Sequence, residues 1–256
     1  MMLLCIDIGN TNLVFGLWDG GKWLDRWRVR TVQNKMPDEY AMLMKTLLTE
    51  RGYALEDVGR VAIASVVPRL KSVFQELFLR YFGIEPLIIG PGVRTGLKIR
   101  IDNPVELGAD LVADAVAAYS RFNTACIIVD FGTATTFSAV SKEGEFMGVA
   151  IAPGIEVAAD ALSSKAAQLP RINLVAPPKA IGTNTIHSMQ SGLIYGYIGL
   201  VEGLIHRIRE EIGGEAVVVA TGGLSEVLAP LTKEIEEIDA DLTLEGLRII
   251  MERNTG

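Results

Sequence analysis

Residues 3–12 read Leu3-Leu4-Cys5-Ile6-Asp7-Ile8-Gly9-Asn10-Thr11-Asn12. The apolar run predicts a buried strand that carries a carboxylate, Asp7, near its end. Gly9 and Asn10 permit positive φ, so we expect a tight turn into a second strand through Leu13-Val14-Phe15. Such a turn aims backbone N–H groups at one point, which suits phosphate oxygens, and the Asp7 carboxylate suits Mg²⁺. The alternative interpretation is a β-hairpin with an Asx turn and no ligand.

The same pattern occurs a second time in the chain. It reads Cys126-Ile127-Ile128-Val129-Asp130-Phe131-Gly132-Thr133-Ala134-Thr135, and Asp130 follows Asp7 by 123 residues. At this offset Gly9 matches Gly132, Asn10 matches Thr133 and Asn12 matches Thr135. Two copies, each opening half of the chain, predict two related domains that face each other across a nucleotide.

Composition narrows the class of protein. The 256 residues are enough for two domains with separate cores, and a hydrophobic content of 49% indicates a globular chain. A formal charge of −7 argues against a nucleic-acid-binding surface. Cys5 and Cys126 lie inside the repeated apolar strands, so we interpret them as buried small side chains without a disulfide. Asp7 interrupts the first apolar run early and no uncharged apolar run reaches 18 residues, so we expect no signal peptide, no membrane contact and a cytoplasmic location.

Further patterns predict the remaining helices and strands. In the first half we expect strands at 22–30, 61–65 and 87–89, and helices that begin at Pro37 and Pro68. In the second half we expect three strands up to about Ile151, a helix after Pro153-Gly154, and a long helix from 185 to about 211 with Thr185 as N-cap or near-cap. Four glycines in that helix predict close packing against another helix: Gly192, Gly196, Gly199 and Gly203. A buried strand at 216–220 then ends in Thr221-Gly222-Gly223, where a double glycine lets the backbone approach a ligand.

Asp110 is a candidate catalytic acid or base. It follows the loop Ile101–Gly108 and lies near the start of a predicted helix. One interpretation is a first-turn acid that the helix dipole stabilises. The other is a carboxylate that accepts the proton of an attacking hydroxyl in a kinase cleft. The two common nucleotide fingerprints, GxGxxG and GxxxxGK[ST], are both absent from the chain.

Five motifs taken together resemble the type III pantothenate kinases. They are Asp7-x-Gly9-Asn10-Thr11, Gly108-Ala109-Asp110, Asp130-x-Gly132-Thr133, Gly182-x-Asn184-Thr185 and Thr221-Gly222-Gly223. The resemblance implies an α/β fold of the acetate kinase, sugar kinase, heat-shock ATPase and actin superfamily, with two tandem ribonuclease-H-like (actin-like ATPase) domains, each a mixed sheet flanked by helices. Residues 1–120 would form the N-terminal half with the first phosphate loop and the substrate loop. Residues 121–256 would form the C-terminal half with the second phosphate loop, the adenosine loop and a dimer helix.

The resemblance also implies an activity and a set of site residues. The activity is ATP-dependent phosphorylation of pantothenate to 4'-phosphopantothenate, the first step of coenzyme A biosynthesis, by a homodimer. Residues implied to bind ATP are Asp7, Ile8, Gly9, Asn10, Thr11, Asn12, Leu13, Thr133, Gly222 and Gly223. Residues implied to bind pantothenate are Gly108, Ala109, Asp110, Leu111 and, from the other subunit, Thr185. Asp110 would be the general base, Asp7 would lie near Mg²⁺ held by the phosphates, and Asp130 would bind a monovalent cation, K⁺ or NH₄⁺.

Two positions depart from the family pattern. Leu111 stands where the family usually has arginine, and Ile101 lies where a tyrosine is common, so the anchor for the substrate carboxylate is open. Two alternatives therefore remain: a kinase of another small acid or sugar in the same superfamily, and a catalytically weak or non-enzymatic regulator. The three acids Asp7, Asp110 and Asp130 favour an enzyme, because a protein that only binds has no need of all three.

Overall fold

The computed structural model describes residues 1–255 and divides into two compact units. Unit 1 comprises Met1–Leu97, Asp102–Ala117 and the chain from Asp241 onward, and unit 2 comprises Lys98–Ile101 and Ala118–Ala240. The sequence interpretation assigned all of 121–256 to the second half. In the structure the last helix instead packs within unit 1, where its buried residues Leu244 and Leu247 join Leu3 and Cys5 in one core.

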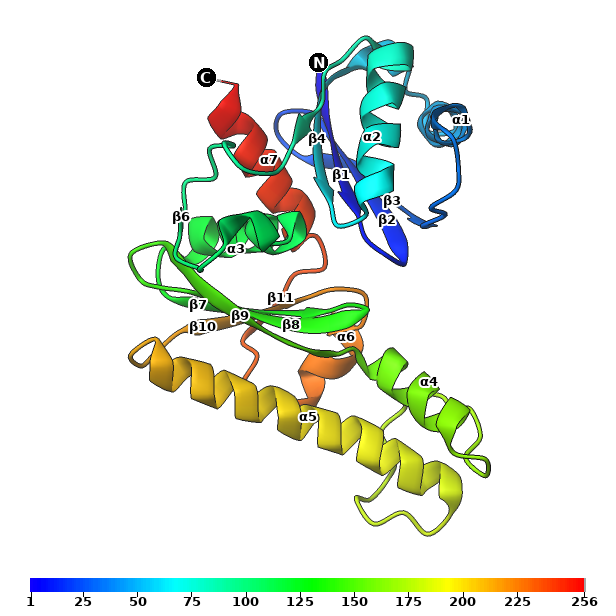
Figure 1. The fold of residues 1–256 in the computed structure, drawn as a ribbon, viewed down its shortest axis with the longest axis vertical. Coiled ribbons are helices and arrows are strands. Elements are labelled where there is room, and N and C mark those ends of the chain that lie inside the picture. Colours follow the sequence, from blue (N-terminus) through cyan, green and yellow to red (C-terminus); the bar gives the residue numbers. More distant parts are fainter. Residues whose placement is uncertain (256) are drawn as a thin grey trace. The chain divides into compact units, whose positions relative to one another are not determined.

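Unit 1 is built on a five-stranded mixed sheet with the order β3-β2-β1-β4-β5 (Figure 1). The first three strands are antiparallel neighbours, whereas β4 and β5 run parallel to β1. The elements are β1 (Met2–Ile8), β2 (Asn12–Trp18), β3 (Trp23–Arg30), α1 (Pro37–Thr49), β4 (Val58–Ser65), α2 (Pro68–Leu77), β5 (Leu87–Ile88), α3 (Ala109–Phe122, of which 109–117 belong to unit 1) and α7 (Leu242–Asn254). These bounds confirm the predicted strands and helices of the first half.

The two faces of this sheet have separate cores because side chains alternate along a strand. Leu4, Ile6 and Ile8 pack with Tyr40 of α1 and Phe74 of α2. On the opposite face Leu3 and Cys5 pack with residues of α3 and α7. Asp7 continues the Leu3, Cys5 series, so its carboxylate belongs to the face that α3 and α7 cover. Both cysteines are free and buried, as predicted, and burial raises the pKa of the Cys126 thiol to about 12.

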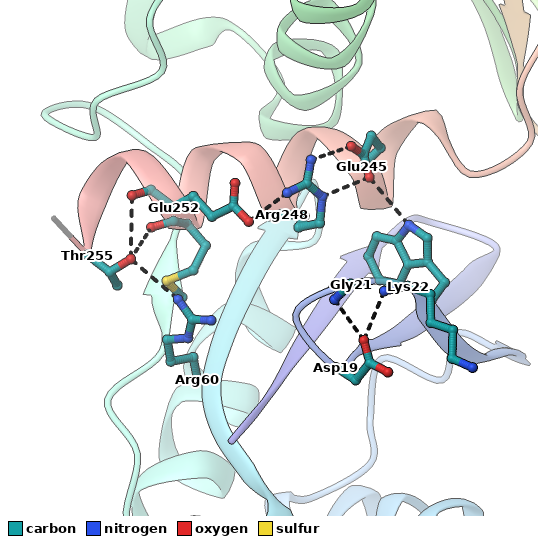
Figure 2. Close-up of polar contacts among 10 residues, drawn as sticks. Asp19, Gly21, Lys22, Arg60, Glu245, Arg248, Glu252 and Thr255 are labelled. Carbon is teal, nitrogen blue, oxygen red and sulfur yellow. Dashed lines mark hydrogen bonds and ion pairs between the residues drawn. The ribbon is translucent and has the colours of Figure 1, made fainter.

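A polar cluster connects α7 with β2 and β3 of this sheet (Figure 2). The Arg248 guanidinium donates to Glu245 at 2.9 Å and to Glu252 at 2.6 Å, and it lies 4.9 Å from the centre of the Trp18 ring. Trp23 donates its indole N–H to Glu245 at 3.3 Å. Hydrogen bonds that Arg248 donates to Glu245 raise the pKa of Arg248, whose side chain is only 16% exposed. The cluster therefore anchors α7 through a guanidinium with two carboxylate partners and an aromatic platform.

Unit 2 is built on a six-stranded mixed sheet with the order β11-β10-β7-β8-β9-β6 (Figure 1). Its elements are β6 (Lys98–Ile99), β7 (Cys126–Phe131), β8 (Ala134–Val140), β9 (Glu145–Pro153), α4 (Ile155–Lys165), α5 (Thr185–Glu211), β10 (Val217–Thr221), α6 (Ser225–Leu228) and β11 (Glu237–Ile238). Ile127, Val129 and Phe131 of β7 pack with Ile194 and Val201 of α5. No helix within residues 1–255 has the length and apolarity needed to cross a membrane.

The two sheets share one topology. The order β9-β8-β7-β10-β11 repeats β3-β2-β1-β4-β5, with two antiparallel contacts followed by two parallel ones in each case. Strand β6 is an addition beside β9. The predicted duplication and the predicted fold class, two mixed sheets flanked by helices, are confirmed.

Two local predictions are wrong, and a third holds in one of its two forms. Gly9 and Asn10 do not adopt positive φ; glycine suits position 9 because a Cβ there would lie only 3.0 Å from the Asn12 carbonyl oxygen. Asp7 pairs with Val14 but Asp130 pairs with Thr136, so the second loop is one residue shorter and Thr135 corresponds to Leu13, not to Asn12. The N-cap of α5 is Asn184, and Thr185 is the first residue of the helix, which agrees with the near-cap form of the prediction.

Candidate active site

The first hairpin loop, Gly9–Asn12, keeps its carbonyl oxygens occupied within unit 1. The Gly9 N–H donates to the Asn12 oxygen at 3.0 Å. Thr31, directly after β3, donates its backbone N–H to the Thr11 oxygen at 2.9 Å and its hydroxyl to the Gly9 oxygen at 2.7 Å. Because these three oxygens already accept hydrogen bonds, the loop does not turn them toward an anion. This arrangement suits phosphate binding by backbone N–H groups.

Asp7 and Asp110 lie on the same face of the unit 1 sheet. Asp7 is paired in register with Ala64 of β4. Ala64 and Ala109, the first residue of α3, belong to one cluster of buried side chains. Asp110 is the next residue of that helix, so the fold places both predicted acids on the α3 side of the sheet.

Asp110 has an unusual environment for a carboxylate. Its Oδ1 accepts a hydrogen bond from the Leu111 N–H at 2.8 Å. Burial raises the pKa of Asp110 above its ordinary value, and the backbone hydrogen bonds offset only part of this effect. Glycine suits position 108 because a Cβ there would lie 2.4 Å from Asp110 Oδ1. The Leu111 side chain is 8% exposed, so the structure buries this residue.

The second acidic loop brings Asp130 together with hydroxyl groups in unit 2. Across the antiparallel pair, Asp130 lies opposite Thr136, and in the parallel pair it is in register with Thr221. Thr221 is 2% exposed, and the buried Thr136 hydroxyl has no hydrogen-bond partner. Opposed residues in a sheet place their side chains on one face, so the Asp130 carboxylate has an unsatisfied hydroxyl as its cross-strand neighbour.

Gly222 closes this group of residues from the end of β10. It has φ +90°, and a Cβ on it would lie 2.2 Å from Asp130 Oδ1 and 2.7 Å from the Phe131 backbone. Gly222 and Asp130 therefore come together, although they are 92 residues apart in the sequence. Gly223 follows Gly222 at the same turn, which leads into α6.

Gly154 holds the second loop as Thr31 holds the first. Its N–H donates to the Thr133 oxygen at 3.1 Å. A Cβ at this position would lie 2.4 Å from the Gly132 oxygen and 2.5 Å from the Thr133 oxygen, so the backbone of Gly154 lies directly against the loop. The Thr133 carbonyl is thereby occupied, as the Thr11 carbonyl is in unit 1.

Thr185 lies apart from these residues, at the first turn of α5. The Asn184 side chain caps this helix by accepting the His187 N–H at 2.9 Å. Thr185 lines a pocket of about 710 Å³ in unit 2. The pocket is lined by Leu162, Leu169, Gly182, Thr183, Asn184, Thr185, Ser188, Met189, Gly192 and Leu193. The glycines of α5 have open space around them in the described chain, since a Cβ at 192, 196, 199 or 203 would meet nothing within 4 Å.

The sequence interpretation missed several polar groups of these loops. Thr31, Thr136 and the bond between Thr135 and Tyr197 were not singled out. Hydroxyl enrichment after Asp130 was a usable signal for the threonines, because such side chains are costly to bury without a purpose. Residues 1–255 contain no group of three or more His, Cys, Asp or Glu side chains able to hold a metal ion.

Solved structures of other proteins share this fold. A structure from Campylobacter jejuni, described as a Baf family transcriptional activator, matches with a TM-score of 0.61 and 20% identity, covering 98% of each chain. One from Listeria monocytogenes, described as an N-acetylmannosamine kinase, matches with a TM-score of 0.57 and 13% identity, covering 100% of each chain. At such identities these likenesses concern the fold alone.

Sequence relatives are far more similar. A type III pantothenate kinase of Moorella thermoacetica is 50% identical over 254 residues, which is 99% of this chain and 100% of that protein. That of Myxococcus xanthus is 50% identical over 99% of both chains. The family model for type III pantothenate kinase matches residues 3–207. On this evidence the chain belongs to the type III pantothenate kinase family.

Proposed function

We propose that this chain transfers the γ-phosphoryl group of ATP to the primary hydroxyl of pantothenate, with Asp110 as the base. Membership of the family supports the reaction, which opens coenzyme A biosynthesis. The single observation that carries the residue assignment is the partly buried Asp110 carboxylate at the start of α3, on the sheet face that also carries Asp7. An exposed first-turn acid would not have its pKa raised by burial.

The proposed chemistry is a direct displacement. The Asp110 carboxylate accepts the proton of the pantothenate hydroxyl while the hydroxyl oxygen forms a bond to the γ-phosphorus. The bond from that phosphorus to the bridging oxygen breaks, and ADP leaves. A raised pKa makes Asp110 a stronger base than an ordinary carboxylate. Most of the remaining catalysis would come from positioning and from charge neutralisation at the phosphates.

Residues from each of the two hairpin loops are proposed to bind ATP. The residues proposed to bind it are Asp7, Ile8, Gly9, Asn10, Thr11, Asn12, Leu13, Thr133, Gly222 and Gly223. Support comes from the Gly9, Thr11, Asn12 and Thr133 carbonyls, which already accept hydrogen bonds from the protein and so are not turned toward an anion. The close approach that Gly222 permits supports a role at the adenosine end of the nucleotide.

Two cations are proposed to accompany ATP. A divalent metal fits Asp7, since Mg²⁺ commonly uses one or two carboxylates plus substrate phosphates rather than a full protein cage, and no such cage occurs in residues 1–255. A monovalent cation, K⁺ or NH₄⁺, fits Asp130, because the neighbouring Thr136 hydroxyl is buried without a partner and can supply a further oxygen. These cations would offset the charge of the phosphates.

Pantothenate is proposed to bind at Gly108, Ala109, Asp110 and Leu111, with Thr185 of a second subunit. Leu111 is buried and apolar, so it cannot anchor the substrate carboxylate as an arginine would. Backbone N–H groups of the Gly108 loop and the Thr185 hydroxyl are the proposed replacements. A cytoplasmic location is proposed because the reaction consumes ATP.

A homodimer is proposed to complete this substrate site. Support comes from the pocket beside Thr185 and from the open space around the glycines of α5, which would admit a helix of a second copy. Subunits carrying Asp110→Asn and subunits carrying Thr185→Ala should regain part of the activity when mixed under conditions of subunit exchange. Two inactive variants that restore no activity on mixing would contradict a shared site.

The decisive test of the proposed function uses Asp110→Asn beside the matched control Asp102→Asn, an exposed acid in the preceding loop. We expect Asp110→Asn to lower pantothenate phosphorylation by about 10²-fold or more while ATP still binds. Asp102→Asn should keep normal turnover. A folded Asp110→Asn protein with near-normal turnover would refute the assignment of the base.

A further inference from the structure

We propose that Tyr197 is a positioning residue for ATP, because its hydroxyl holds the β8 end of the loop that carries Thr133 and the end of β9 that lies beside this loop. The inference rests on the proposed function, in which Thr133 contacts an ATP phosphate. Tyr197 lies in the middle of α5, is 7% exposed and belongs to the buried core of unit 2. A phenylalanine would fill such an apolar site without burying a hydroxyl, so the hydroxyl calls for a separate explanation.

The Tyr197 hydroxyl joins two strands at the end where the loop lies. It is hydrogen-bonded to Thr135 Oγ1 on β8, two residues after Thr133, and it donates to the Pro153 carbonyl at the end of β9 at 3.2 Å. A phenol has one proton, so with that proton on Pro153 the Thr135 hydroxyl is the donor to Tyr197. Burial raises the pKa of Tyr197, which keeps the phenol protonated and able to donate.

The bond to Pro153 reaches the loop through the next residue. Gly154 donates its N–H to the Thr133 carbonyl and lies against Gly132, where no Cβ would fit. Tyr197 therefore supports Gly132–Thr133 in two ways: through Thr135, which follows the loop on β8, and through Pro153-Gly154 at the end of β9, which lies against the loop. Loss of its hydroxyl would leave Thr135, which is 1% exposed, without this partner and would release the backbone that supports Thr133.

The other half of the duplicated fold contains an equivalent brace. Tyr40 of α1, which is fully buried, donates its hydroxyl to the Val32 carbonyl at 2.9 Å and accepts the Val32 N–H at 3.0 Å. Val32 follows Thr31, the residue that holds the first loop. In both halves, a tyrosine of the helix that covers the sheet thus fixes the chain at the end of the third strand: Tyr40 of α1 acts after β3, and Tyr197 of α5 acts at the end of β9. Chance burial of one hydroxyl would not produce this correspondence.

The test compares Tyr197→Phe with the matched control Tyr195→Phe. Tyr195 lies on the same helix and also donates to a proline carbonyl, that of Pro177 at 2.6 Å, but this proline lies in the irregular segment before α5. We expect Tyr197→Phe to raise KM for ATP by about three- to tenfold, with KM for pantothenate within about twofold of wild type. Hydrogen exchange of residues 131–135 should become faster in Tyr197→Phe and stay unchanged in Tyr195→Phe.

A second pair of variants keeps the proposal testable if Tyr197→Phe does not fold. Thr135→Val should reproduce the weaker use of ATP, whereas Thr135→Ser, which keeps the donor, should behave as wild type. Equal ATP kinetics and equal loop exchange in all these variants would overturn the positioning role. If wild type fails to phosphorylate pantothenate, the proposed function is refuted, but the role of Tyr197 can still be tested. ATP should then protect residues 131–135 from hydrogen exchange strongly in wild type and more weakly in Tyr197→Phe if the Tyr197 hydroxyl acts on a nucleotide site.

Discussion

Replacement of Gly222 by alanine measures how tightly the turn after β10 is packed against Asp130. Two costs add at this position. Gly222 has φ +90°, and an L-residue held at positive φ costs about 1–2 kcal/mol. The new Cβ would also lie 2.7 Å from the Phe131 backbone, which cannot rotate away as a side-chain end can, and overpacking of this kind costs about 1–3 kcal/mol. We expect Gly222→Ala to lower the free energy of unfolding of unit 2 by about 2–5 kcal/mol.

Gly213 supplies a matched control for the backbone cost alone. It has φ +89°, but a Cβ there would meet nothing within 4 Å, so Gly213→Ala should cost only about 1–2 kcal/mol. Urea unfolding should be followed by circular dichroism, because all three tryptophans lie in unit 1 and do not report on unit 2. Gly222→Ala should also weaken ATP binding, since the Cβ displaces the Asp130 carboxylate. Equal destabilisation by the two variants, with unchanged ATP affinity, would refute the reasoning.

Three further predictions follow from charged groups. Because burial raises the pKa of Asp110, the stability that this group contributes is present below the ordinary carboxyl pKa and is lost as pH rises through the raised value. Asp110→Asn should therefore raise the melting temperature at about pH 7 and lose this advantage toward about pH 4. An unchanged melting temperature near neutral pH would contradict this prediction. Arg248→Lys should lower the free energy of unfolding of unit 1, followed by tryptophan fluorescence, by about 1–3 kcal/mol and leave kcat unchanged; an unaltered unfolding curve would contradict the anchoring role. Activity should depend on K⁺ or NH₄⁺ in addition to Mg²⁺, and equal rates in ammonium-free Na⁺ buffer would count against the cation at Asp130.

The sequence predicted those features that are encoded locally. The hairpin β1–β2, its copy β7–β8 and the bounds of α5 follow from apolar periodicity, glycine turns and a polar residue at a helix start. The division of the chain could not be predicted in this way. The apolar face of α7 shows that the helix must be buried, but not that Leu244 and Leu247 pack with Leu3 and Cys5, more than 200 residues earlier.

The candidate site residues likewise include some that short motifs single out and others that only the folded chain brings together. Asp7, Asp110, Asp130 and Gly222 were predicted because each stands in a short motif whose spacing carries information. The bond between Thr135 and Tyr197 spans 62 residues, and neither residue type is unusual in its segment. A single sequence contains no periodicity that joins a strand threonine to one particular helical tyrosine, so this contact required the folded chain.

The two hairpin loops differ in length, and different groups hold each of them in place. Thr31 and Gly154 occupy the same place, directly after the third strand, and each donates its N–H to a loop carbonyl. The second loop is one residue shorter, and the closer approach leaves no room for a Cβ at Gly154, whereas Thr31 keeps a side chain that bonds the Gly9 carbonyl. A glycine cannot supply that hydroxyl. Tyr197, the counterpart of Tyr40, instead bonds Thr135 and Pro153 beside the second loop, which ties the position of Thr133 to the helix whose first turn carries Thr185.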